Sequence, residues 1–483
     1  MKKLFLSLVI ATSTIFLANA GGLVTNSNQS ASYYRMLARG ASISGDAVYY
    51  NPAGLAFLDQ GLTISLNTQM IWMKRTLTSD LQTLKNKEFV GTLYVPVFPG
   101  VYAAYKTGNW AFSLGFNPPA GGGSIEFADG LPMLENDVSA IPAMLSGNGI
   151  PTTQYSMTSM MKGSSIVYGV QAGATYRINE MFSVFGGLRM SFASNGYEGY
   201  LKDVKVNPTV PPFLTGQMLG SSELLASSAQ INATADALGP ENPQYVPLKT
   251  LAGGLQAVGT NITDKSLDAT QKGSGIAPII GIHFNTGNLN LAAKYEFSTK
   301  ITLTNDPKKD DLNMYPKAVE LRSDVPALLS LAGSYDISPA LRFSVTYLHH
   351  FEPQATIESW APNATLPQGG TIIQRQDLID KGTNEFMAGL EWKLGDKFLV
   401  SAGCQYTKFG VSDQWQNDIT HHLSNFTMGL GAAYHINERM SLNIGGLYTW
   451  YDSSTIKFAN PIPHNMTYDR ANKAVAIGID YRF

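Results

Sequence analysis

The stretch 166-IVYGVQAGATYRINEMFSVFGGLRMSF-192 decides the fold class, because apolar residues alternate there with small or polar ones over two long runs. A period of two puts one set of side chains on each face of a β-strand. The two runs are joined by Asn179-Glu180, which is turn chemistry. Two alternating runs separated by such a turn predict an antiparallel hairpin.

The same hairpin pattern recurs along the chain from Gly61 to Phe483. Similar turns follow alternating runs at 284–288, 335–339, 392–396 and 434–438. Long irregular segments separate the hairpins, the largest at about 118–164 and 195–273. Tight turns on one side and long loops on the other are typical of a transmembrane antiparallel β-barrel. Counting the runs predicts an all-β fold with about 14 strands over residues 61–483.

The composition agrees with a membrane barrel. Charged residues make up only 14% of the chain, whereas 46 glycines, 23 tyrosines and 22 phenylalanines are present. A soluble protein of this size carries about a quarter charged residues. The net charge of −2 does not indicate a nucleic-acid partner. A single cysteine, Cys404, excludes an internal disulfide framework.

The first 20 residues have the three zones of a secretory signal peptide. Lys2 and Lys3 precede an apolar run, which ends at Ala18-Asn19-Ala20. The run is too short to span a membrane as a helix, for which roughly 20 apolar residues are needed. We therefore expect cleavage after Ala20 and localisation in the outer membrane of a Gram-negative cell.

The last strand alternates up to the carboxyl terminus and ends on an aromatic ring. Val475, Ile477, Ile479, Tyr481 and Phe483 form its apolar face. A terminal aromatic strand resembles the signal by which outer-membrane barrels are presented to their assembly machinery. We expect Phe483 to carry this signal and the barrel assembly machinery to be a partner.

Residues 21–60 break the alternating pattern. The small-residue run 38-ARGASISGDA-47 is followed by Asn51-Pro52-Ala53-Gly54, just before the first strand. This arrangement resembles the N-terminal hatch of the FadL-type outer-membrane transporter family. The resemblance implies a hatch over residues 21–60 that plugs a 14-stranded barrel, and uptake of long-chain fatty acids or aromatic hydrocarbons. It also implies that Asn51, Pro52, Ala53 and Gly54 lie beside a kink in the third strand.

The third predicted strand covers 110–117 and is followed at once by Pro118, Pro119, Gly121 and Gly122. Proline cannot donate to a sheet ladder, and glycine adds no lateral packing. Pairing of the wall should therefore fail there, which makes these four residues a candidate lateral opening. An ordinary flexible loop base is the alternative.

Apolar residues also occur in the two longest predicted loops, where water should surround the chain. They are Leu131, Met133, Leu134, Phe213, Leu214, Met218 and Leu219. An apolar groove in these loops could capture a hydrophobic ligand. The alternative is that the residues merely pack against one another.

No motif indicates an enzyme, a metal or a cofactor. The pairs His349-His350 and His421-His422 are adjacent in sequence, so on a strand their side chains point to opposite faces and form no ready chelate. No local nucleophile and base motif is present. We expect neither catalysis nor a cofactor.

The functional hypothesis from sequence is passive uptake of a hydrophobic small molecule, such as a long-chain fatty acid or hydrocarbon. Capture by the loops would be followed by a rearrangement of the hatch and lateral release into outer-membrane lipid. Two alternatives remain: a porin-like general pore, and a barrel that serves as a carrier or anchor in protein secretion.

Overall fold

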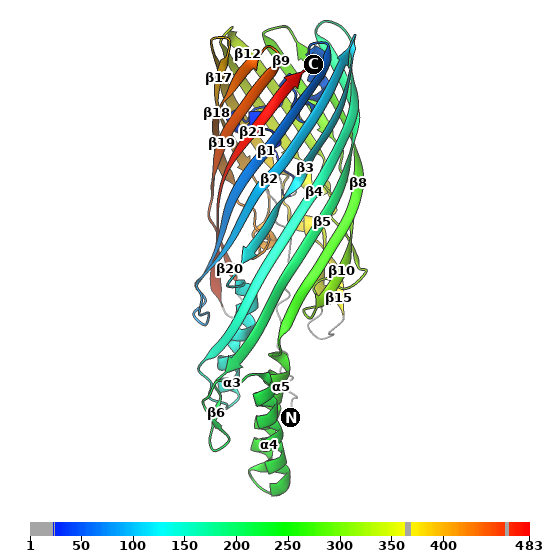
Figure 1. The fold of residues 1–483 in the computed structure, drawn as a ribbon. Coiled ribbons are helices and arrows are strands. Elements are labelled where there is room, and N and C mark those ends of the chain that lie inside the picture. The colour runs from blue at the N-terminus through cyan, green and yellow to red at the C-terminus, as the bar shows by residue number, and fades with distance from the viewer. Residues whose placement is uncertain (1–22, 24, 363–368, 459–462) are drawn as a thin grey trace.

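A computed structural model describes residues 23, 25–362, 369–458 and 463–483. The predicted signal peptide lies outside these residues. Figure 1 shows a tall barrel of tilted strands, with tight turns at one end and long connections at the other. These are called the turn end and the loop end below. The carboxyl terminus lies at the turn end.

Seventeen strands form the sheet of the barrel. They are β1 Gly61–Ser79, β2 Glu88–Thr107, β3 Trp110–Phe127, β4 Tyr155–Arg177, β5 Phe182–Val206, β8 Lys265–Asn285, β9 Leu289–Glu296, β10 Thr302–Asp310, β11 Glu320–Arg322, β12 Leu328–Ser338, β13 Leu341–His350, β16 Asn384–Leu394, β17 Phe398–Lys408, β18 Asn425–Asn437, β19 Met440–Tyr451, β20 Ser454–Phe458 and β21 His464–Arg482. At three positions in the wall, two separate strands together occupy the place of one strand of the barrel, so the seventeen strands fill 14 positions. β9 and β10 share β8 as a neighbour, β12 and β11 pair with β9 and β10, and β19 and β20 share β21. The predicted closed antiparallel barrel of 14 strands is thus confirmed.

The first and last strands close the barrel. β1 and β21 pair antiparallel from Thr63↔Arg482 to Ser79↔Met466. This seam joins the two ends of the sheet, so the backbone donors and acceptors of β1 and β21 are satisfied within the wall.

The outer face of the wall is apolar and exposed. On β3, the side chains of Trp110, Phe112, Leu114 and Phe116 point outward. Stacked or tilted aromatic pairs such as Trp72 with Tyr94 also lie on the outside. A continuous apolar face of this kind is suited to contact with hydrocarbon and not with water. None of the helices in the described part of the chain is long and apolar enough to cross a membrane.

The predicted loop bounds 118–164 and 195–273 are wrong, because four strands continue far beyond them. β3 reaches Phe127 and β4 starts at Tyr155, while β5 reaches Val206 and β8 starts at Lys265. β5 alone is 25 residues long. The strand extensions are rich in polar residues and glycine because they stand beyond the apolar belt, so their pattern does not resemble a membrane strand.

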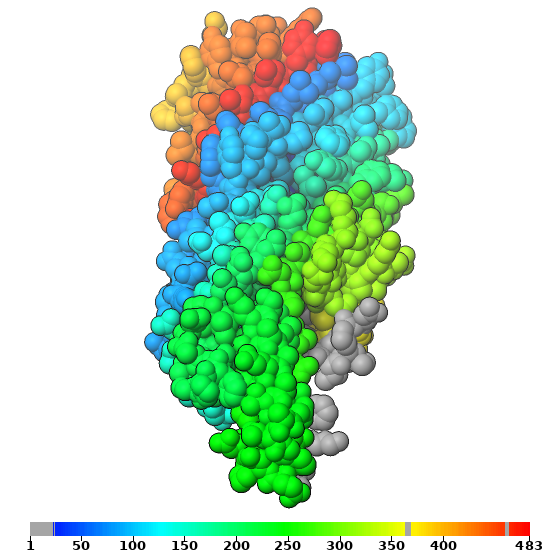
Figure 2. All heavy atoms as spheres, turned by 60° about the horizontal axis from the view of Figure 1, so that its bottom comes forward, coloured from blue at the N-terminus to red at the C-terminus, as the bar shows by residue number. Residues whose placement is uncertain are grey.

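The loop end carries the remaining elements. They are α3 Pro132–Gly147, β6 Thr209–Val210, β7 Leu214–Thr215, α4 Ser221–Leu238, α5 Tyr245–Asn261, η2 Glu352–Gln354, β14 Glu358–Pro362, β15 Gly370–Gln374, η3 Arg375–Leu378 and η4 Asp413–Trp415. The antiparallel helices α4 and α5 project furthest from the barrel (Figures 1 and 2). Figure 2 shows that side chains cover this end of the molecule.

The N-terminal segment, residues 25–58, fills the lumen. It contains α1 Ala31–Arg35, α2 Ala47–Tyr50 and the 3-10 helix η1 Pro52–Phe57. Glycines on the inner wall let its backbone approach closely. A Cβ atom at Gly445 would lie 2.6 Å from the Arg35 nitrogen, and one at Gly429 would lie 2.5 Å from the Tyr34 carbonyl oxygen. The many glycines of the sequence therefore serve in part to admit this segment.

Deletion of Phe483 should impair membrane insertion. The Phe483 amide donates to the Leu62 carbonyl at 2.9 Å, and its ring packs edge-on against Tyr481 at the seam. The amount of protein in outer-membrane fractions and heat-modifiable gel migration measure the effect. Levels of truncated protein equal to those of the full chain would contradict the prediction.

Candidate functional site

The wall of the barrel is broken between β2 and β3. The two strands pair from Thr107↔Trp110 to Val101↔Phe116, and again at Thr92↔Glu126 and Gly91↔Phe127. Between these ladders, residues 93–100 of β2 and 117–125 of β3 do not pair with each other. The break contains Pro118, Pro119, Gly121 and Gly122, which were proposed from sequence as the lateral opening. Proline is tolerated inside β3 because no neighbouring strand needs its missing amide.

The N-terminal segment bonds three carbonyls of β3 that the break leaves open. Its Asn26 amide nitrogen donates to the Pro119 carbonyl at 2.7 Å, and the Asn26 side chain donates to the Gly121 carbonyl. Gln29 Nε2 donates to the Pro118 carbonyl at 3.1 Å. Buried backbone groups without partners are costly, so these contacts hold the segment against the wall.

Two glycines of the break differ in their surroundings. Gly121 has a φ of +82°, and a Cβ atom there would lie 2.5 Å from the Ser165 carbonyl oxygen. Only glycine suits that backbone conformation and contact. A Cβ atom at Gly122 would meet nothing within 4 Å. The backbone at Gly121 is therefore fixed by its contact with β4, whereas the space beside Gly122 is open.

Two pockets lie in the lumen on either side of Asn26 and Ser27, which line both. The first pocket, of about 720 Å³, is lined by segment residues and by wall residues from β5, β9, β12, β13 and β16. The second pocket, of about 690 Å³, extends from Gly121 and Gly122 to Tyr451. Both pockets thus border the break and are separated by the residues that hold it.

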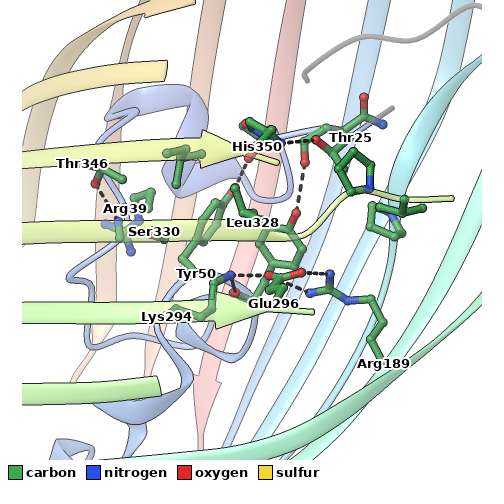
Figure 3. Close-up of a pocket in the computed structure, with 18 of the residues that line it drawn as sticks. Thr25, Arg39, Tyr50, Arg189, Lys294, Glu296, Leu328, Ser330, Thr346 and His350 are labelled. Atoms are coloured by element: carbon green, nitrogen blue, oxygen red, sulfur yellow. Dashed lines mark hydrogen bonds and ion pairs between the residues drawn. The ribbon is translucent and has the colours of Figure 1, made fainter. Parts of the chain in front are cut away.

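The first pocket combines apolar side chains with a buried charged cluster (Figure 3). Lys294 and Arg189 both bind the carboxylate of Glu296, with Lys294 Nζ 2.6 Å from Glu296 Oε1. Lys294 also donates to the Tyr49 carbonyl at 2.7 Å, which ties the cluster to the N-terminal segment. Two cations share one acid here, and all three side chains are more than nine-tenths buried.

A second polar group closes the pocket toward the loop end. His350 Nε2 donates to Glu385 Oε1 at 2.7 Å, and Thr25 Oγ1 lies 3.1 Å from His350 Nδ1. The Glu385 carboxylate also accepts from Ser27 Oγ at 3.0 Å. Residues 25–27 are therefore held both by the break and by the opposite wall.

The four residues Asn51, Pro52, Ala53 and Gly54 lie in the lumen but not beside the break, so the implied adjacency is wrong. The Pro52 carbonyl accepts from Thr175, which pairs with Ala111 at the start of β3. Pro118, the first of the four residues named for the break, stands seven residues further along that strand, about 23 Å at the usual rise. The resemblance alone supplied the adjacency.

Asn51 has a local role at the turn end. Its side-chain nitrogen donates to the Ser42 carbonyl at 2.9 Å and lies 2.9 Å from His283 Nδ1. His283 in turn contacts Asn290 through Nε2. The motif thus attaches the end of the N-terminal segment to β8.

The predicted groove residues fall into two separate apolar clusters. Leu131, Met133 and Leu134 pack at the mouth of the lumen, and Leu131 lines a third pocket, of about 330 Å³, with Phe127, Tyr197 and Ile419. Phe213, Leu214 and Leu219 pack with the ends of α3, α4 and α5, and Met218 is half-buried nearby in sequence. The seven residues therefore form no single cluster, and capture of a ligand by them stays a prediction.

Sequence reasoning missed Asn26 and Gln29, and it considered His350 only as a metal ligand and set it aside. The first two stand in a short polar run, 25-TNSNQS-30, ahead of the small-residue stretch. Amide side chains in a segment expected inside a lumen were the available signal, because they can pair with open backbone groups. Arg189, Lys294 and Glu296 lie on two different strands, and nothing in the sequence paired them.

Comparison with known proteins gives a match of structure only. Neither a protein-family model nor a curated protein sequence matches the chain. The crystal structure of a Pseudomonas aeruginosa FadL homologue matches with a TM-score of 0.63 over 96% of this chain and 100% of that one, at 12% identity. The chain has the FadL-type fold.

Two transporters of toluene share this FadL-type fold. The Pseudomonas putida toluene transporter TodX matches with a TM-score of 0.57 and 15% identity, over 92% of this chain and 96% of that one. The Ralstonia pickettii toluene transporter TbuX matches with a TM-score of 0.54 and 15% identity, over 94% and 98%. The FadL-type likeness covers the lumen segment and the barrel together, because nearly all of each chain is aligned.

Replacing Glu296 by glutamine should destabilise this FadL-type barrel by about 3–5 kcal/mol, the cost of leaving buried cations unpaired. The free energy of unfolding in urea, measured in phospholipid vesicles, reports the change. Glu198→Gln is the matched control. Its pair with Lys162 is exposed, with 3.4 Å between nitrogen and oxygen, and should matter by less than about 1 kcal/mol. Equal effects of the two substitutions would contradict the prediction.

Proposed function

We propose that this protein resides in the Gram-negative outer membrane and takes up hydrophobic small molecules passively. The observation that carries the proposal is the break between β2 and β3, which borders a pocket in the lumen. A pore for water-soluble solutes has no use for an opening in its side wall. An apolar molecule can use one, because it leads to hydrocarbon.

Lateral release is favoured by the free energy of transfer. An apolar molecule that leaves the lumen for lipid avoids water, which saves roughly 25 cal/mol for each Å² of apolar surface. For a long acyl chain the saving amounts to several kcal/mol. Passage straight into the aqueous periplasm would forgo it. Pro118, Pro119, Gly121 and Gly122 would form the edge of the exit.

The route begins at the loop end. The third pocket, with Leu131 and Ile419, would capture the ligand, and the apolar side chains of the first and second pockets would carry it past Asn26. Residues 25–29 would act as the moving part of the hatch, since they separate the two pockets and hold the break. The Asn51 motif would serve as the fixed attachment of the same segment.

The ligand class is a long-chain fatty acid or a similar hydrophobic compound. The structural neighbours TodX and TbuX are described as toluene transporters. A lumen filled by the N-terminal segment speaks against a general porin. No feature of the described residues favours a carrier or anchor role in secretion.

Uptake of labelled oleate by intact Gram-negative cells that lack their own fatty-acid uptake barrel tests the proposal. Expression of the chain should raise the rate, whereas uptake of a polar sugar should stay unchanged. A porin would raise sugar uptake, and a secretion anchor would raise neither. Either result would overturn the proposed function.

A disulfide between residues 25 and 120 should block uptake. Thr25 and Ala120 are antiparallel bridge partners, so their Cβ atoms are close enough for a disulfide. Thr25→Cys with Ala120→Cys, in a Cys404→Ser background, should lower oleate uptake at least about tenfold when oxidised, and reduction should restore it. The two single-cysteine variants are the controls. Unchanged uptake at high disulfide yield would exclude a moving segment at the break.

Asn51→Ala should lower oleate uptake severalfold while barrel assembly stays intact. The change leaves the Ser42 carbonyl and His283 Nδ1 short of a buried partner, at about 1–3 kcal/mol each, but alters no strand pairing. Uptake rate and heat-modifiable migration are the two measurements. A normally assembled variant with the wild-type rate would show that Asn51 plays no part in transport.

A further inference from the structure

Arg75 is a buried cation at the loop end of the lumen. It lies on the inner face of β1, with only 1% of its surface exposed. Directly across the seam, its pairing partner on β21 is Arg470, which is also buried. Side chains that are directly opposed on one face of an antiparallel pair lie within about 5.5 Å at their Cβ atoms. Two positive charges are therefore held close together out of water.

Four other cations of the lumen form an ion pair with an acid, but among the described residues Arg75 does not. Arg35 pairs with Glu391, Arg39 with Asp46, and Arg189 and Lys294 with Glu296. Arg75 donates one hydrogen bond, to the Ile419 carbonyl at 2.9 Å, and its Nε has no partner. Among the residues that the structure describes, no carboxylate forms an ion pair with it.

Within the described part of the chain, neither the acid nor the histidine of the loop next to Arg75 forms an ion pair with it. The carboxyl of Asp418, in the loop above, accepts from the Met133 amide at 2.8 Å and from the Tyr468 hydroxyl at 3.3 Å. Burial raises the pKa of this carboxyl to about 6. Burial and the positive charges of Arg75 and Arg470 lower the pKa of His421 well below its ordinary value. His421 is thus neutral near pH 7 and does not add to the repulsion.

The arginines lie next to the second pocket. Ile71 and Met73 line that pocket and precede Arg75 on the same inner face of β1. Residues two apart on a strand are about 7 Å apart along it. Tyr451 also lines the pocket, and its ring centroid lies 4.8 Å from the Arg470 guanidinium. The arginines thus stand just beyond the lining of the pocket on its loop side, whereas Gly121 and Gly122 line it.

We propose that Arg75 and Arg470 form an anion site that binds the carboxylate of an amphiphile whose apolar chain lies in the second pocket. The inference rests on the proposed function and adds a ligand contact to it. A carboxylate matches the planar guanidinium and supplies the counter-charge that Arg75 lacks. The site orients the ligand with its head toward the loop end and its tail toward the break. A neutral hydrocarbon would gain nothing from it.

The charged cluster of the first pocket is less suited to this task. Glu296 already binds both Lys294 and Arg189, so an incoming carboxylate would meet a negative charge there. At Arg75 an incoming anion meets two arginines, and no carboxylate of the described residues forms an ion pair with Arg75. The electrostatic difference favours the arginine pair as the site for the head group.

Equilibrium dialysis of the purified full-length barrel in neutral detergent tests the site, with labelled laurate and 1-dodecanol as probes. The two molecules have the same chain and differ in charge. Arg75→Gln should weaken laurate binding at least about tenfold and leave 1-dodecanol binding unchanged. Arg75→Lys, which keeps the charge, should retain most of the laurate affinity. Lys473→Gln is the matched control, because Lys473 stands on the same seam but is exposed.

The outcomes separate the anion site from the proposed function. Laurate binding that is unchanged in Arg75→Gln, or that falls together with 1-dodecanol binding, overturns the anion site. A wild-type barrel that binds neither probe overturns the proposed function itself. Heat-modifiable migration of each variant checks the fold. If Arg75→Gln does not assemble, competition of acetate with laurate, but not with 1-dodecanol, on the wild-type barrel decides the question in the same way.

Discussion

Backbone hydrogen bonding governs this molecule more than any side-chain contact. A strand in hydrocarbon has no water to bond its amides and carbonyls, so the wall has to close on itself. The seam between β1 and β21 achieves that closure. The break between β2 and β3 departs from the rule, and Asn26 and Gln29 then provide the bonds that a neighbouring strand would have given. The N-terminal segment is, in this respect, part of the wall.

The cost of burying polar groups without partners also explains the distribution of charge. Inside the barrel, burial makes an unpaired charge expensive, and most lumen cations accordingly have an acid within reach. Arg35, Arg39, Arg189 and Lys294 tie the N-terminal segment and the inner wall into one charge-balanced body. Among the described residues, no acid forms an ion pair with Arg75. Because Arg75 lies beside a pocket, its charge is available to bind an anionic ligand there.

The sequence predicted the barrel well and the site only in part. Alternation reports which face of a strand meets lipid, so the hairpins and the strand number followed directly from runs such as 166–192. Beyond the lipid both faces of a strand meet water or loops, and the signal is lost. For that reason the ends of β3, β4, β5 and β8 were missed. Continuing the alternation along β1 would have placed Arg75 on the inner face.

Contacts across the lumen could not be read from the sequence. Pro118 and Pro119 marked the break because their missing amides act locally. The partner of the break, Asn26, is 92 residues away from Pro118 and depends on how the segment threads the lumen. The Asn51 motif was placed beside the break by resemblance alone, and the structure puts it near the other end of β3.

A chain that occupies its own barrel also sets an order of events for its biogenesis. The N-terminal segment is joined directly to β1, and its contacts reach strands from β2 to β19. β1 and β21 are the two edges that meet last in the circuit of the wall, since they are the ends of the sequence of strands. Once β1 and β21 are paired, the N-terminal segment would have to pass through a closed barrel to reach its position in the lumen. Entry of the segment into the lumen before or during the pairing of β1 with β21 would avoid that passage.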